Sequence, residues 1–148
     1  MKRLFAGLCA LALLFLISPQ PLVQAETRTA GPFSYDVSQE VTLSGSVSSV
    51  LMKPAAGMIM GSHLLLATSS GPVDASLGRF GLRGKGSVSV AAGQQVELTG
   101  VMKTIKNRQV FLTRTVKVNG KIYPIRNEHG VSISPQARQR AAQKGESL

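Results

Sequence analysis

Cysteine, tryptophan, histidine and acidic side chains are all scarce in this chain. It has one cysteine, Cys9, no tryptophan, two histidines, and 7 acidic residues against 17 lysines and arginines. Because Cys9 lies in an apolar stretch near the start, the rest of the chain has no thiol for a disulfide, a thiolate metal site or a cysteine nucleophile. The formal net charge of +10 favours anionic partners, such as phospholipid head groups, polyanionic sugars, acidic proteins or nucleic acid. Simple solubility is the alternative explanation of that charge.

The N-terminus has the pattern of a secretory signal peptide. Two basic residues precede an apolar run over residues 4–17, and two prolines and then Ala25 follow it. A membrane-spanning helix needs about 20 apolar residues, and this run is shorter. We therefore predict that residues 1–25 are a bacterial signal peptide cleaved after Ala25, and that the protein is periplasmic or secreted. Retention of the segment as a membrane anchor is the alternative.

Alternating apolar and polar residues predict an all-β domain over residues 41–130. In V-T-L-S-G-S-V at 41–47 every second residue is apolar or glycine, which is the period of a strand with one buried face, and the pattern returns at 96–102. Each of these strands has a central inward-facing glycine, Gly45 or Gly100, which permits a bend or a close backbone approach. Because closing a small barrel requires strongly bent strands, these glycines favour a barrel.

The remaining strands are predicted to be short and linked mostly by tight turns. Lys106-Asn107 and Asn119-Gly120 indicate hairpins, since asparagine and glycine tolerate the positive φ of a type I′ turn. The glycine-rich segment 78–86 is predicted to be irregular. Four further strands are expected, over residues 63–68, 73–77, 110–118 and 121–126. The strand set predicts a small OB-like Greek-key β-barrel of five to six strands.

Two flanking segments complete the predicted organisation. Residues 26–40 are polar and are predicted to form a flexible lead-in. Residues 131–148 form a basic C-terminal tail, in which Ser134 followed by Pro135 predicts the start of a short helix. That helix, over 136–144, is almost wholly polar and is therefore expected on the surface.

Several motifs of the β domain carry a family resemblance. They are V-T-L-S-G-S-V at 41–47, H-L-L-L-A-T at 63–68, G-P-V-D-A-S-L-G at 71–78, A-G-Q-Q-V-E-L-T-G at 92–100 and F-L-T-R-T-V-K-V-N-G-K-I-Y-P-I-R at 111–126. On these motifs the segment 41–130 resembles the small exported bacterial OB-fold proteins, some of which are described as DNA-binding or magnetosome-associated. The resemblance implies an OB fold and a histidine at His63. It brings no catalytic motif.

The sequence has no recognisable catalytic or metal-binding motif. His63 and His129 have no HxxxH or HExxH spacing, and no serine lies in G-x-S-x-G. Asp74 and Glu97 are placed on outward strand positions, where they are expected to face lysine or arginine. We therefore predict a non-enzymatic protein with no catalytic residue, no cofactor and no metal.

Two metal hypotheses remain as alternatives to that prediction. His63 is expected to make structural hydrogen bonds, with contact to a metal or a haem propionate as the alternative. The sulfurs of Met52, Met58 and Met60 suit Cu(I), but methionine more often packs.

Basic residues in the predicted loops define a candidate ligand-binding surface. Its members are Arg79, Phe80, Arg83, Lys85, Lys103, Lys106 and Arg108. We predict that this surface binds a protein partner or an anionic ligand in the cell envelope. The first alternative is binding of single-stranded nucleic acid, with Phe80 stacking on a base rather than plugging the barrel end. The second alternative is a metal or redox accessory role.

Overall fold

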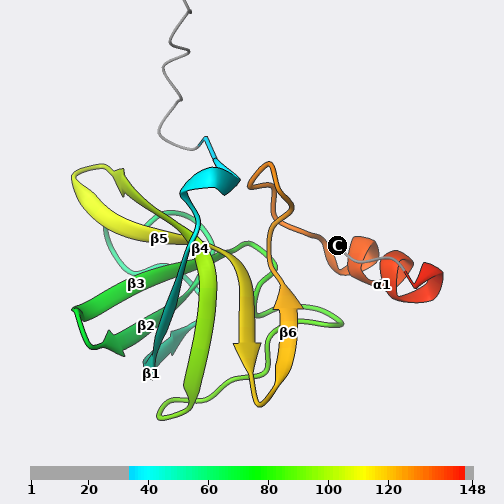
Figure 1. The fold of residues 1–148 in the computed structure, drawn as a ribbon, viewed down its shortest axis with the longest axis horizontal. Coiled ribbons are helices and arrows are strands. Elements are labelled where there is room, and N and C mark those ends of the chain that lie inside the picture. The colour runs from blue at the N-terminus through cyan, green and yellow to red at the C-terminus, as the bar shows by residue number, and fades with distance from the viewer. Residues whose placement is uncertain (1–33, 146–148) are drawn as a thin grey trace, which may run out of the picture.

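The computed structural model describes residues 34–145, and these form a β-barrel followed by one short helix (Figure 1). The strands are β1 (Val41–Leu51), β2 (Ser62–Thr68), β3 (Gly71–Gly78), β4 (Gln95–Ile105), β5 (Arg108–Val118) and β6 (Lys121–Pro124). A 3-10 helix, η1 (Val37–Gln39), precedes them and α1 (Pro135–Lys144) follows. The predicted signal peptide, residues 1–25, lies outside the described residues. Among residues 34–145, no helix is long and apolar enough to cross a membrane.

Five of the strands close on themselves and the sixth lies outside. The sheet order is β3-β2-β1-β4-β5-β6, and a further pairing of β3 with β5 closes the barrel. That closing pair is parallel and covers two register positions, Ala75 opposite Phe111 and Ser76 opposite Leu112, whereas all the other strand pairs are antiparallel. This arrangement confirms the prediction of an all-β, OB-like barrel with one extra strand.

Both inward-facing glycines lie where two backbones come very close. A Cβ atom added to Gly100 would lie 2.2 Å from the carbonyl oxygen of Leu112, and one added to Gly45 would lie 2.6 Å from that of Ala67. In β4 a register shift falls immediately before Gly100. The expectation that missing side chains allow the strands to bend and approach is therefore confirmed.

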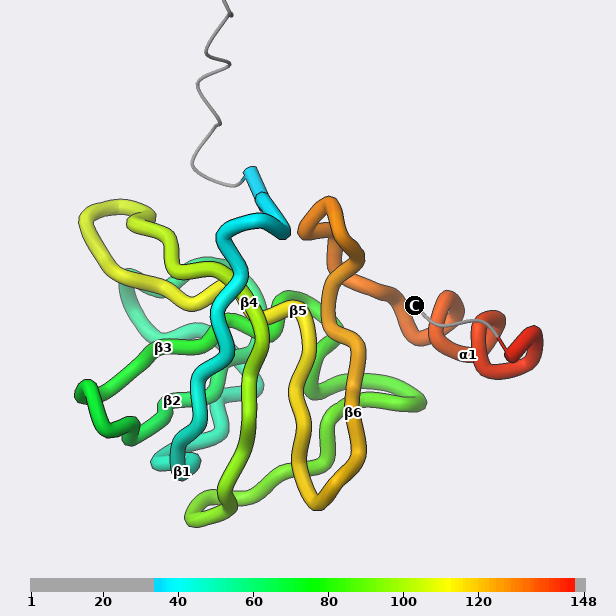
Figure 2. Tube along the Cα trace, in the orientation of Figure 1, coloured from blue at the N-terminus to red at the C-terminus, as the bar shows by residue number. Residues whose placement is uncertain are grey.

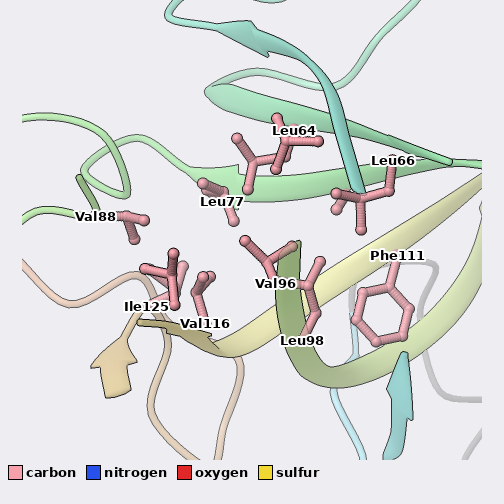
Figure 3. Packing of buried hydrophobic residues seen from close by; sticks show 12 residues of the cluster. Leu64, Leu66, Leu77, Val88, Val96, Leu98, Phe111, Val116 and Ile125 are labelled. Atoms are coloured by element: carbon pink, nitrogen blue, oxygen red, sulfur yellow. The ribbon is translucent and has the colours of Figure 1, made fainter. Parts of the chain in front are cut away.

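Apolar side chains from the strands converge in the barrel interior (Figure 3). Leu64, Leu77, Leu98 and Phe111 are completely buried, and each such side chain contributes about 1.5–3 kcal/mol to folding. A second, smaller cluster consists of Val101, Ile105, Val110 and Leu112. Tyr35 from the lead-in and Ile59 from the β1–β2 loop pack against that second cluster.

The predicted turns and tail helix are present. Lys106 and Asn107 have φ values of 50° and 61°, and Asn119 and Gly120 have 51° and 75°, as type I′ hairpins require. The Ser134 hydroxyl accepts a hydrogen bond from the Ala137 amide at 3.2 Å and caps α1. Figure 2 shows α1 to one side of the barrel, beyond β6. The helix is not wholly exposed, because Arg138 and Ala141 are buried.

The end of the lead-in is attached to the barrel by a polar cluster. The Tyr35 hydroxyl donates to Glu40 Oε1 at 2.6 Å. Arg114 on β5 donates from Nη2 to Glu40 Oε2 at 2.8 Å and from Nε to Oε1. No sequence pattern indicated this cluster, because Arg114 lies 74 residues from Glu40 in the chain.

Candidate binding site

Two cavities lie near the ends of β1 and β3, and they share two lining residues. The first has a volume of about 440 Å³ and the second about 430 Å³. Both are lined by Met60 of the β1–β2 loop and by Arg79, which follows β3. The first is also lined by Met58, Ile59, Gly78, Lys106, Leu112, Arg126, Gly130 and Ser132. The second is also lined by Met52, Lys53, Pro54, Gly61 and Arg83.

Positive charge dominates the lining of both cavities. The cations are Lys53, Arg79, Arg83, Lys106 and Arg126, and no lining residue is an aspartate or glutamate. A concave surface lined by charge of one sign raises the local concentration of counter-ions and ligands of the opposite sign. The rest of the lining is largely apolar, with methionine contributed by the β1–β2 loop.

Four of the seven predicted site residues gather at these cavities. Arg79, Arg83 and Lys106 line them. Arg108 lies beside them, and its Nη1 donates to the carbonyl oxygen of Ala56 at 3.3 Å. Arg83 likewise donates from Nη2 to the carbonyl oxygen of Met52 at 3.1 Å. Arg108 therefore connects the β1–β2 loop to the start of β5, and Arg83 connects it to the glycine-rich segment 78–86.

The other three predicted site residues lie elsewhere. Lys85 is exposed in the glycine-rich segment, and Lys103 is half-buried on β4. Phe80 is half-buried, and its carbonyl oxygen accepts a hydrogen bond from Arg138 Nη2 at 2.6 Å. None of the three lines either cavity.

Arg126 is the principal lining residue that the sequence did not single out. It is only 7% exposed, and burial lowers the pKa of its guanidinium to about 10, so the group remains cationic at neutral pH. Its Nη1 donates to the carbonyl oxygens of Ser76 (2.9 Å) on β3 and Thr113 (2.8 Å) on β5, and its Nη2 donates to the Ser76 hydroxyl (3.1 Å). The strand predicted over 121–126 ends at Pro124, so Arg126 lies outside β6.

His63 forms a buried ion pair with Asp74. Its ring is fully buried, with Nδ1 2.6 Å from Asp74 Oδ1 and Nε2 2.9 Å from the carbonyl oxygen of Ile59. Both partners are acceptors, so the pair is satisfied by a doubly protonated imidazolium. Burial favours the neutral ring, but the hydrogen bonds to Asp74 and Ile59 outweigh it and raise the pKa of His63 overall.

Two predictions for this region have different outcomes. The structural role expected for His63 agrees with its two hydrogen bonds. The outward, lysine- or arginine-facing position expected for Asp74 is wrong, because its carboxylate is nearly buried against His63. Glu97 does face a lysine, Lys117, at 3.7 Å. Within residues 34–145, no group of three or more histidine, cysteine, aspartate or glutamate side chains is placed to hold a metal.

Comparison with known proteins finds no match to a family model, a curated protein or a solved structure.

Proposed function

We propose that this protein is a non-enzymatic binding module of the cell envelope that takes an anionic ligand, or an acidic surface of a protein partner, at the two cavities. The observation that carries the proposal is their lining: five cations, no carboxylate, and an apolar remainder. The predicted signal peptide supports a site of action in the periplasm or outside the cell. Nothing in the lining provides the paired acid and base that most hydrolytic chemistry requires.

Single-stranded nucleic acid is the second candidate ligand. The β1–β2 loop and the β4–β5 turn contribute to the first cavity, and the corresponding loops of OB folds commonly bind oligonucleotides. Against this candidate, neither cavity is lined by an aromatic side chain, whereas base stacking contributes about 1–3 kcal/mol per base in such sites. The anionic small-molecule or protein ligand is therefore favoured.

The test compares two double charge reversals that change net charge equally. R79E/K106E alters the cavities, whereas K85E/R140E alters exposed positions outside both. The probes are phosphatidylglycerol nanodiscs, a fluorescein-labelled decaglutamate peptide and a labelled 20-mer of thymidylate. For at least one of the first two probes, we expect R79E/K106E to weaken binding about tenfold or more, as lost charge-assisted contacts would, with K85E/R140E near wild type.

Two results would contradict the proposal. Equal losses in both variants would show that overall charge, rather than these cavities, determines binding. Binding of the oligonucleotide alone would instead favour the nucleic-acid function, with an affinity that falls steeply with salt.

A further inference from the structure

Arg126 has no charged partner in the part of the chain that the structure describes. The ion pairs among residues 34–145 join Asp74, Glu40, Glu97 and Glu128 to other cations. The Arg126 guanidinium is hydrogen-bonded only to two carbonyl oxygens and a hydroxyl. Arginine is rarely this buried unless it is paired, because a charge removed from water is costly without compensation. A negatively charged partner for Arg126 is therefore expected in the first cavity, which Arg126 lines.

The guanidinium also retains hydrogen-bond donors. Of the five N–H donors of an arginine, those on Nη1 are both used and one of the two on Nη2 is used. Nη2 lies beside Gly78, where an added Cβ would be 3.2 Å away. Gly78 lines the first cavity together with Arg126, and its missing side chain leaves room for both Nη2 and Ser132 Oγ, which would be 2.3 Å from the same Cβ position. Ser132 therefore lies on the same side of Gly78 as Nη2, and it also lines this cavity.

The lining of the same cavity also has an apolar part. Met58, Ile59 and Leu112 line it, and Met60 extends the wall outward with 83% of its surface exposed. Arg79 and Lys106 add positive charge around the guanidinium. A volume of about 440 Å³ falls within the range of pockets that enclose small organic ligands, about 300–1,000 Å³.

We propose that the first cavity binds an anionic amphiphile. Its phosphate or carboxylate group is held by Arg126, and its hydrocarbon chain lies along the wall of Met58, Ile59 and Leu112. A charge-assisted hydrogen bond from Nη2 to a compact oxyanion supplies the missing counter-charge. This inference rests on the proposed function and specifies its ligand class.

Isothermal titration calorimetry with four probes tests the ligand class. Octyl phosphate carries both the charge and the chain, inorganic phosphate only the charge, and octyl glucoside only the chain. We expect octyl phosphate to bind about tenfold or more tightly than either of the others, because only it occupies both parts of the cavity. Octanoate distinguishes an acyl carboxylate from a phosphate head group as the natural anion: the tighter of the two octyl anions identifies the head group.

Two variants test the role of Arg126 itself. R126Q removes the charge, and R138Q is its matched control, because Arg138 is equally buried at 6% exposed, is bonded to carbonyl oxygens, and lies outside the first cavity. We expect R126Q to weaken octyl phosphate binding about tenfold or more and R138Q to leave it unchanged.

S132D keeps the test valid if R126Q does not fold. Ser132 pairs with Arg126 in an antiparallel bridge, so a carboxylate there would neutralise the guanidinium from within. We expect S132D to fold at least as stably as wild type and to lose octyl phosphate binding. Wild-type affinity in the folded Arg126 and Ser132 variants, or equal affinity of octyl phosphate and octyl glucoside for the wild type, would overturn the inference. The proposed function would still stand if R79E/K106E and K85E/R140E differed on the nanodisc or peptide probe.

Discussion

Replacement of Asp74 by asparagine would remove the charge of the buried His63 pair while keeping its shape. An asparagine amide can donate to Nδ1 of a neutral ring, whose Nε2–H still reaches the Ile59 carbonyl oxygen. A hydrogen bond to a charged group contributes about 1.5–3 kcal/mol and a neutral one about 0.5–1.5 kcal/mol. The difference predicts that D74N lowers the free energy of unfolding by about 1–2 kcal/mol where His63 is protonated.

The size of that loss should depend on pH in a defined direction. The pKa of His63 is raised in the folded state above its unfolded value of 6.5. The stabilisation from the charged pair is therefore fully present below pH 6.5, and it is lost as pH rises through the folded-state pKa. Asp74 supplies the facing negative charge, and Arg126 opposes protonation weakly. In D74N this pH-dependent contribution should be absent.

Urea unfolding of the wild type and D74N, followed by far-UV circular dichroism from pH 6 to pH 9, measures both quantities. We expect the difference in unfolding free energy to shrink toward zero as the pH rises. A difference that stays constant over this range, or grows toward pH 9, would refute the charged pair.

Two further predictions concern the backbone of the fold. Gly100→Ala should lower the free energy of unfolding by about 1–3 kcal/mol, because the new methyl group would clash with the Leu112 carbonyl oxygen. Urea unfolding measures this loss, and an unchanged midpoint would contradict the close approach. Ser134→Ala should lower the stability of α1 by about 1 kcal/mol, because it removes the N-terminal cap of the helix. Faster amide hydrogen exchange in α1 would measure this loss, and the control Gln136→Ala, at an exposed position, should show no such change.

Local sequence signals accounted for most of the fold. Period-two alternation, the Asn119-Gly120 turn and the paired inward glycines are each properties of a few neighbouring residues, and together they predicted the strands and the barrel. The boundary of β6 was predicted two residues too long, since 121–126 contains no break after Pro124. The difference matters for the site, because Arg126 was predicted to be part of a strand and instead lines the first cavity.

The candidate site was only partly predictable, because it depends on distant contacts. Arg79, Arg83 and Lys106 were recognised as basic residues in loops, which is a local property. Arg126 is held in place by hydrogen bonds to the carbonyl oxygens of Ser76 and Thr113. No sequence pattern indicates that Arg126 lies next to these two residues. Asp74 was misplaced for the same reason: alternation puts it on the outer face of β3, but there its carboxylate meets His63 of the neighbouring strand β2, whose ring is also bonded to Ile59 of the β1–β2 loop.

The pairing of β3 with β5, which closes the barrel, constrains the order in which the chain can fold. β3 and β5 pair at only two register positions, and Arg126 Nη1 joins them by bonding to one carbonyl oxygen on each strand. Contacts between residues so far apart in sequence form late, because the entropy of closing a long loop must be overcome first. A growing or emerging chain can therefore form the β1–β2–β3 meander early, but it can close the cylinder only after β5 is available, and Arg126 can join the two strands only after that.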